Sequence, residues 1–338
     1  MADDWLILHA GALGDLLLTL QLALRLPGVA ESEGVRVVSR TDPGDLSACR
    51  PSIVRRSSEG LGLHWLFGDQ AEPPPERLRA LIGGARVLSA LGGAHTITHH
   101  RLDALAPAAL YSIDPRPRDG VDRHVTQQWQ TQLEEQGLLV PKCVHQRPAQ
   151  RGLGVPEELR ARGRQLLAEC VARAGANTAS ASDPLAAARG SDGTRVLVHP
   201  GSGGASKCWP LACFVNVARR LSKANVGVFF LVGPVELERW DDTQLAVLAD
   251  EFPILRSPSP DELVAVIAGA TALIGNDAGP SHLAALLGAR TVVIFGPTAS
   301  SVWRPLGADV RVLSGDPRAA AGDWGLAPAA VVKALGLP

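Results

Sequence analysis

Three short segments combine glycines with side chains that can move protons or bind phosphates. The first, Gly11–Asp15, follows the apolar run Trp5–Leu8 and places a carboxylate at the start of an apolar helical stretch. A carboxylate there can act as a general base that takes a proton from an attacking hydroxyl. A lone Asp at this place can also cap the helix, and the residues alone favour the cap.

The second segment, His199–Pro210, is rich in glycine and serine and contains Lys207. Such a loop exposes backbone N–H groups that can surround phosphate oxygens, and the lysine adds a compact positive charge. It is not a Walker A loop, because the G-K-[ST] ending is missing. Phosphate binding and a flexible surface loop with a solvated lysine are about equally favoured by this segment alone.

The third segment, Gly275–Leu283, again lies between an expected strand and an expected helix. Gly279 followed by Pro280 permits a sharp entry, which leaves N–H groups of the next turn available to an anion. Asp277 and His282 lie near that helix pole, although one could merely cap the helix and the other merely pack. Ligands of open α/β sheets bind at strand-to-helix turns, so the second and third segments together predict a diphosphate site.

The elements that must position these segments are strands alternating with helices. In the second half, strands are expected at Arg195–Val198, Val226–Val232, Ala272–Ile274 and Thr291–Phe295, and helices at Leu211–Leu221, Asp261–Ala268 and Ser281–Leu287. In the first half, strands are expected at Trp5–Leu8, Val35–Val38 and Arg86–Leu88, and helices at Leu16–Leu26 and Arg123–Gln136. Continuous apolar strands between helices predict parallel sheets covered on both faces, hence two doubly wound α/β domains.

The expected domains are residues 1–155 and residues 156–338. The first ends in a proline-rich connector, and a helix is expected from Pro156 to about Ala174. A linker of small residues is expected at 177–193, and the stretch 39–75 carries no assignable pattern.

Composition narrows the classes of function. The chain has 338 residues, with 33 Lys and Arg against 34 Asp and Glu, so no positive field exists to hold nucleic acid. The five cysteines form no C-x-x-C pair, which predicts reduced thiols in a cytoplasmic protein. The apolar run Leu16–Leu26 follows acidic residues and is too short to span a membrane, so a soluble protein is expected.

The motifs resemble the heptosyltransferase family (ADP-heptose:lipopolysaccharide heptosyltransferases, glycosyltransferase family 9). The matching residues are Leu13-Gly14-Asp15, His199–Ser202 with Lys207 and Trp209-Pro210, Gly275–Ala285, and Phe295–Thr298. The likeness is strong from about residue 195 to residue 305, and recognisable at the N-terminus and near residues 123–137.

The resemblance implies a GT-B fold, in which two Rossmann-like domains carry the active site in the cleft between them. It implies inverting sugar transfer without a metal or another cofactor, and no D-x-D motif occurs in the chain. The implied partners are a nucleotide-sugar donor, expected to be ADP-heptose, and a glycan or glycolipid acceptor of the lipopolysaccharide-core type. Peripheral contact with the inner face of a membrane is also implied.

The resemblance also assigns roles to residues. Asp15 is implied to be the general base, Lys207 to neutralise the departing diphosphate, and Glu236 to bind the ribose. The N–H groups of Gly279–His282 are implied to hold phosphates, and Asp277 to contact the sugar. The donor-binding set is then Ser202, Lys207, Glu236, Asp277, Ala278, Gly279, Pro280 and His282.

The acceptor side departs from the family pattern. His9 stands where the family usually carries Lys or Arg, and a histidine is largely neutral at pH 7. The acceptor-side candidates are His9, Gly14 and Arg101. Arg101 belongs to a cluster with three histidines, His95, His99 and His100, which could meet an acidic acceptor, although a solvated polar loop is favoured. Trp65 and Phe67 are expected in the core.

Two further classes of function compete with the enzyme. A nucleotide-sugar-binding protein without catalysis is motivated by the divergent first half, while the presence of Asp15 argues against it. A nicotinamide-dependent dehydrogenase is disfavoured because the spacing G-x-G-x-x-G is missing.

Overall fold

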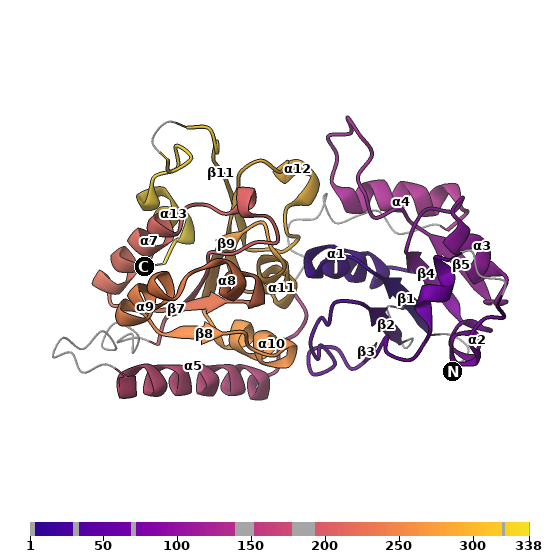
Figure 1. Ribbon diagram of the computed structural model, residues 1–338, viewed down its shortest axis with the longest axis horizontal. Coiled ribbons are helices and arrows are strands. Elements are labelled where there is room, and N and C mark those ends of the chain that lie inside the picture. The colour runs from indigo at the N-terminus through magenta and orange to yellow at the C-terminus, as the bar shows by residue number, and fades with distance from the viewer. Residues whose placement is uncertain are drawn as a thin grey trace. The chain divides into compact units, whose positions relative to one another are not determined.

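The computed structural model describes residues 4–29, 34–68, 72–138, 152–177, 193–319 and 322–337. The chain forms two compact units, Met1–Pro148 and Ala149–Pro338 (Figure 1). The sequence places the boundary after residue 155, seven residues later. Leu153 already belongs to the second unit, because its N–H donates to the carbonyl of Leu286 at 2.8 Å. Of the expected linker 177–193, residues 178–192 lie outside the described ranges.

The first unit is built on a five-stranded parallel sheet in the order β3-β2-β1-β4-β5. Its strands are β1 (Trp5–His9), β2 (Val35–Ser39), β3 (Ile53–Arg56), β4 (Arg86–Ala90) and β5 (Ala109–Ser112). Its helices are α1 (Leu13–Ala23), η1 (Leu63–Leu66), α2 (Glu76–Ile82), α3 (Ile97–Asp103) and α4 (Val125–Glu135).

The second unit is built on a six-stranded parallel sheet in the order β11-β10-β9-β6-β7-β8. Its strands are β6 (Arg195–His199), β7 (Gly227–Val232), β8 (Ile254–Arg256), β9 (Ala272–Asn276), β10 (Arg290–Phe295) and β11 (Val310–Ser314). Its helices are α5 (Glu157–Asn177), η3 (Ala205–Lys207), α7 (Leu211–Lys223), α8 (Pro234–Arg239), α9 (Asp242–Glu251), α10 (Pro260–Gly269), α11 (Gly279–Leu287), α12 (Ser300–Trp303) and α13 (Pro328–Leu335).

Both strand orders are of the doubly wound, Rossmann-like kind. From β8 across to β11 the second sheet runs third, second, first, fourth, fifth and sixth strand in chain order, and the first sheet follows the same scheme with five strands. The order reverses between β6 and β9 in one unit and between β1 and β4 in the other. Ligands of such sheets bind beyond the carboxyl ends of the strands at this reversal.

The central strands are apolar because both of their faces are covered. Every residue of β1, β7 and β9 is buried, as expected for parallel strands between two helical layers. In the second unit, α5 packs along α10, as Figure 1 shows. A Cβ atom at Gly163 would lie only 1.9 Å from the carbonyl oxygen of Ala265, so glycine permits this close helix contact.

The predicted alternation of strands and helices is confirmed, with several corrections to individual residues. Helix α1 begins at Leu13, three residues before the expected start, so Asp15 lies inside its first turn. The unassigned stretch 39–75 contains β3 and η1. Trp65 is buried as expected, but Phe67 is 54% exposed, because it follows η1 with its ring outside the core. In the described ranges, no helix is both long and apolar enough to cross a bilayer.

Candidate functional site

The loops that follow β6 and β9 are joined by a buried asparagine at the strand-order reversal. Asn276, the last residue of β9, is fully buried. Its Oδ1 accepts a hydrogen bond from the N–H of Trp209 at 3.0 Å, and its Nδ2 donates to the carbonyl of Pro200 at 2.7 Å. The two Gly-rich segments singled out in the sequence are therefore brought together beyond the carboxyl ends of adjacent strands.

The loop after β6 is held by specific contacts, which argues against a flexible surface loop. The hydroxyl of Ser202 donates to the carbonyl of Asp277 at 2.8 Å, and its side chain is buried. From α8, Arg239 donates to the carbonyls of Ser202 and Gly203 at 3.0 and 2.7 Å. The buried indole of Trp209 anchors the end of the loop by donating to the carbonyl of Asp323 at 2.8 Å.

A buried carboxylate, Asp277, forms the centre of the site. Its Oδ2 lies 3.2 Å from Nζ of Lys207 and accepts a hydrogen bond from the hydroxyl of Thr298 at 2.9 Å. Its Oδ1 lies 3.8 Å from Nε2 of His282. Burial would raise the pKa of Asp277, but the His282 side chain, the Lys207 charge and the Thr298 hydroxyl together hold that pKa below its usual value. The carboxylate is therefore ionised at neutral pH, and Asp277 is not the cap of α11, whose N-cap residue is Ala278.

The first turn of α11 offers fewer backbone donors than the sequence suggests. Pro280 has no N–H, and the N–H groups of Ser281 and His282 donate to the carbonyl of Ala278 at 3.0 and 3.4 Å. Of the four residues Gly279–His282 that were expected to hold phosphates, Gly279 contributes the remaining N–H group. The side chain of His282 is buried, and its Nδ1 has no hydrogen-bond partner within the part of the chain that is described. The site is thus built from side chains as much as from the helix terminus.

A second carboxylate, Glu236, lies buried next to the same loop. Its Oε2 accepts a hydrogen bond from the N–H of Gly233 at 2.9 Å, and a Cβ atom at Gly201 would come within 1.9 Å of Oε1. Gly201 therefore makes room for this carboxylate. His199 is buried nearby, with Nδ1 donating to the carbonyl of Leu231 at 3.0 Å. Burial lowers the pKa of His199 against the opposing charge of Glu236, so the ring is neutral.

In the first unit, the loop after β1 brings three of the predicted residues together. Asp15 is half-buried in the first turn of α1, where its charge suits the positive end of the helix. Gly11 is the shared neighbour of His9 and Asp15: a Cβ atom there would lie 2.8 Å from Cε1 of His9 and 3.2 Å from Oδ2 of Asp15. His9 is buried, and burial lowers its pKa to about 4.

The other acceptor-side candidates have structural contacts. Gly14 is buried in α1. The guanidinium of Arg101 donates to the carbonyl of Trp65 and lies over the Trp65 ring, 5.3 Å from its centroid. The histidine cluster is not a polar loop, because His99, His100 and Arg101 belong to α3, and His99 pairs with the hydroxyl of Ser112 at 2.8 Å. These contacts tie α3 to η1 and β5, and an acceptor role for Arg101 stays a prediction.

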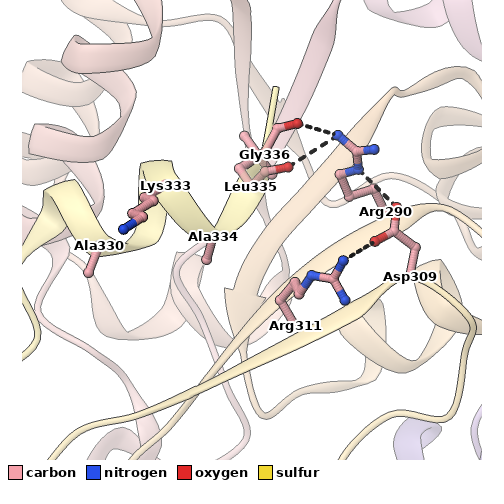
Figure 2. A pocket seen from close by; sticks show the side chains of 8 residues that line it. All are labelled: Arg290, Asp309, Arg311, Ala330, Lys333, Ala334, Leu335 and Gly336. Carbon is pink, nitrogen blue, oxygen red and sulfur yellow. Dashed lines mark hydrogen bonds and ion pairs between the residues drawn. The ribbon is translucent and has the colours of Figure 1, made fainter. Parts of the chain in front are cut away.

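A pocket of about 480 Å³ lies at the amino ends of β10 and β11, away from the loops described above (Figure 2). The guanidinium of Arg290 occupies one side of it, paired with Asp309 at 2.9 Å and bonded to the carbonyls of Leu335 and Gly336. Arg290 therefore caps the carboxyl end of α13, which is a structural role. Over the described residues, no group of three or more His, Cys, Asp or Glu side chains could hold a metal ion.

The comparisons with known proteins agree with this geometry. The chain has the GT-B fold: it aligns with the E. coli heptosyltransferase WaaC solved with ADP over 98% of each chain, at 17% identity and a TM-score of 0.63. It aligns with a family 9 glycosyltransferase of Veillonella parvula over 99% of this chain and 96% of that one, at 17% identity and a TM-score of 0.64. At these identities, the structural likeness shows the fold alone.

The second unit matches a known protein family in sequence. Residues 161–323, which lie in the second unit, match the model of glycosyltransferase family 9 (heptosyltransferase), so the predicted resemblance is confirmed. Lipooligosaccharide heptosyltransferase 2 of Campylobacter jejuni is 30% identical over 119 residues, which are 37% of that protein. Lipopolysaccharide heptosyltransferase 1 of Campylobacter coli is 27% identical over 110 residues, 32% of its length. These matches span about a third of each relative.

Two residues that contact the site, Thr298 and Arg239, had no role predicted from the sequence. Thr298 donates directly to Asp277, and it lies in the Phe295–Thr298 segment that follows β10 and matches the family. Arg239 fixes the loop after β6, and it lies three residues after Glu236 on α8, hence on the same helical face. For Thr298, membership of the family motif was a signal in the sequence. For Arg239, the signal was its helical spacing from Glu236.

Proposed function

We propose that this protein is a glycosyltransferase that moves a heptose from ADP-heptose to an acceptor of the lipopolysaccharide-core type. The observation that carries the proposal is the Lys207–Asp277–Thr298 cluster, formed by loops at the strand-order reversal inside a family 9 domain. The similar proteins support the donor, since one is solved with ADP and others are heptosyltransferases by name.

Lys207 suits the diphosphate of the donor. An ammonium group has three donors, so Nζ can keep its contact with Asp277 and still face phosphate oxygens. Its side chain is 37% exposed, whereas that of Asp277 is 9% exposed, so a ligand can reach the lysine from solvent. The positive charge then neutralises the negative charge that grows on the leaving diphosphate in the transition state.

The two buried carboxylates suit hydroxyl groups of the donor. A carboxylate repels a diphosphate but accepts hydrogen bonds from O–H groups, which sugars carry in number. Asp277 lies beside Lys207 and is proposed to bind the transferred sugar through Oδ1, since Oδ2 is the oxygen that contacts the lysine. Glu236, held by Gly233 and given space by Gly201, is proposed to bind the ribose. Ser202, Ala278, Gly279, Pro280 and His282 complete the proposed donor-binding set.

Asp15 is proposed as the general base of an inverting displacement. The acceptor hydroxyl oxygen attacks the anomeric carbon, its proton passes to the Asp15 carboxylate, and the bond from that carbon to the diphosphate oxygen breaks with its electron pair. The products are the glycosylated acceptor and ADP, with Lys207 in place of a metal beside the leaving group. A lipid-linked acceptor would bring a cytoplasmic enzyme to the inner face of a membrane.

The first test is a thermal-shift panel with ADP, UDP, GDP, NAD and ADP-heptose in the presence of EDTA. A ligand at a hundred times its Kd stabilises the folded state by about 2.7 kcal/mol, which raises the Tm measurably. We expect ADP and ADP-heptose to raise the Tm of the wild type, and Lys207→Ala to lose at least tenfold in affinity because a charge-assisted contact is removed. Lys223 is an exposed lysine at the end of α7, and Lys223→Ala is the matched control.

The alternatives predict different results. A response to UDP or GDP alone would remove ADP-heptose from the proposal, and a response to NAD would favour a dehydrogenase. A protein that binds ADP-heptose but yields no ADP and no glycosylated product by mass spectrometry, with lipopolysaccharide from a heptosyltransferase-deficient strain as acceptor, would be a binding protein without catalysis. Equal ADP affinity in Lys207→Ala and wild type would remove Lys207 from the site.

A further inference from the structure

The side chain of His9 carries a hydrogen-bond donor that the fold leaves unused. His9 is the last residue of β1 and only 3% exposed. Its Nδ1 lies 3.1 Å from the backbone nitrogen of Gly11, whose N–H can only donate, so Nδ1 must be the acceptor. A neutral imidazole with an acceptor at Nδ1 carries its proton on Nε2.

Within the described part of the chain, Nε2 of His9 has no hydrogen-bond partner. Buried donors are nearly always paired, because water that hydrates them in the unfolded chain is lost on burial. His9 directly precedes a strand-to-helix turn, where ligands of such sheets bind, so a ligand can supply the missing partner of Nε2.

The orphaned donor lies near the carboxylate of the proposed base. A Cβ atom at Gly11 would lie 3.5 Å from Nε2 of His9 and 3.2 Å from Oδ2 of Asp15, so both atoms border the space in front of this glycine. The Gly11 peptide is also fixed on both sides, because its N–H donates to His9 and its carbonyl accepts from the hydroxyl of Thr41 at 3.0 Å. The donor and the carboxylate are thus held in a fixed relation by the loop.

We propose that Nε2–H of His9 binds the acceptor sugar, donating a hydrogen bond to an oxygen next to the hydroxyl that Asp15 deprotonates. This inference rests on the proposed function and names a specificity-determining residue for it. Because the ring is neutral and its unpaired nitrogen is a donor, the bound group must be an oxygen with a lone pair, either a hydroxyl or a carboxylate. A positively charged amino group at that position of the acceptor would be rejected.

The test compares two substitutions that separate the two ring nitrogens. His9→Asn can still accept from the Gly11 N–H but has no atom at the ε position, whereas His9→Gln keeps an amide donor there. The acceptor probe is lipopolysaccharide purified from a heptosyltransferase-deficient strain, with ADP-heptose as donor. We expect the acceptor KM to rise about 3- to 10-fold in His9→Asn, the effect of one neutral hydrogen bond, and less in His9→Gln. The KM for ADP-heptose and the ADP-induced Tm shift stay as in the wild type.

A binding measurement separates this proposal from the function on which it rests. In ¹⁵N-labelled protein, the Nε2–H signal of His9, identified by its loss in His9→Gln, should shift when the acceptor is added and stay unchanged with ADP. Turnover by the wild type with an unaltered acceptor KM in His9→Asn would overturn the role of His9 alone. If the wild type shows no turnover, whether or not ADP shifts its Tm, the proposed function is overturned and this inference with it.

Discussion

At the scale of single residues, the two candidate catalytic carboxylates differ in their surroundings. Asp277 is buried, contacts Lys207 and Thr298, and has a lowered pKa, so it is a poor proton acceptor and a good partner for hydroxyl groups. Asp15 is half-buried in the first turn of α1 beside the orphaned donor of His9. This contrast supports the proposed division of roles, with binding assigned to Asp277 and proton transfer to Asp15.

Substitution of these two carboxylates should therefore have different kinetic effects. Asp15→Asn keeps the size of the side chain but removes its basicity, and we expect kcat to fall by 10²-fold or more, the usual contribution of a general base. The ADP-induced Tm shift should be unchanged. Asp277→Asn should instead raise the KM for ADP-heptose. Steady-state kinetics with both substrates checks this split, and near-wild-type kcat in Asp15→Asn would remove Asp15 from the chemistry.

At the scale of elements, α4 carries a row of glutamines that holds the edge of the first sheet. Gln128, Gln132 and Gln136 are four residues apart and so lie on one helical face. Gln136 both accepts from the N–H of Ser112 and donates to its carbonyl, and Gln132 does the same for Asp114. The amides thus satisfy the backbone that continues from β5, the edge strand, as a neighbouring strand would.

Loss of one glutamine should destabilise the first unit measurably. Gln132→Leu keeps the volume of the side chain but leaves the N–H and carbonyl of Asp114 unpaired, which should cost about 1–3 kcal/mol of unfolding free energy. Urea denaturation followed by circular dichroism measures this. Gln127 is half-buried and lies one residue before Gln128, hence on a different helical face, so Gln127→Leu is the control and should change stability by less than about 0.5 kcal/mol. Equal effects would show that the row is not a structural device.

At the scale of the whole molecule, each unit buries a neutral histidine at the carboxyl end of its first strand. His9 ends β1 and His199 ends β6, and burial lowers the pKa of both, that of His9 to about 4. The unfolded chain binds a proton at each near pH 6.5, so between pH 6.5 and pH 4 it binds more protons than the folded chain. Stability must then fall as the pH falls through this window.

The expected pH dependence has a definite size and sign. His9 alone should lower the unfolding free energy by about 2 kcal/mol at pH 5 relative to pH 7, and by about 3 kcal/mol below pH 4. Asp277, whose pKa is lowered, loses its contribution only below about pH 4, so the window from pH 5 to 7 reports the histidines. Urea denaturation against pH checks this, and His9→Gln should flatten the profile; an unchanged slope would contradict the buried neutral ring.

Particular residues show how far the sequence alone could be taken. The strands Trp5–Leu8 and Ala272–Ile274 were predictable because short apolar runs between turn residues carry their own signal. The stretch that contains β3 was not, because three of the four residues of this edge strand are exposed and show no apolar run. Phe67 was wrongly expected in the core. It lies close to the buried Trp65 in the sequence, and no local pattern shows that its side chain is exposed.

By itself, the sequence determined the two parallel α/β units and the loops that carry the proposed donor-binding residues, because apolar periodicity and turn residues act over a few neighbours. Only the tertiary structure decided which side chains of those loops meet. Lys207 and Asp277 are 70 residues apart and pair because β6 and β9 are neighbours in the sheet. The structure likewise placed Arg101 against Trp65 and left Nε2 of His9 without a partner in the described chain. Partners and burial depend on packing between distant segments, which no local pattern specifies.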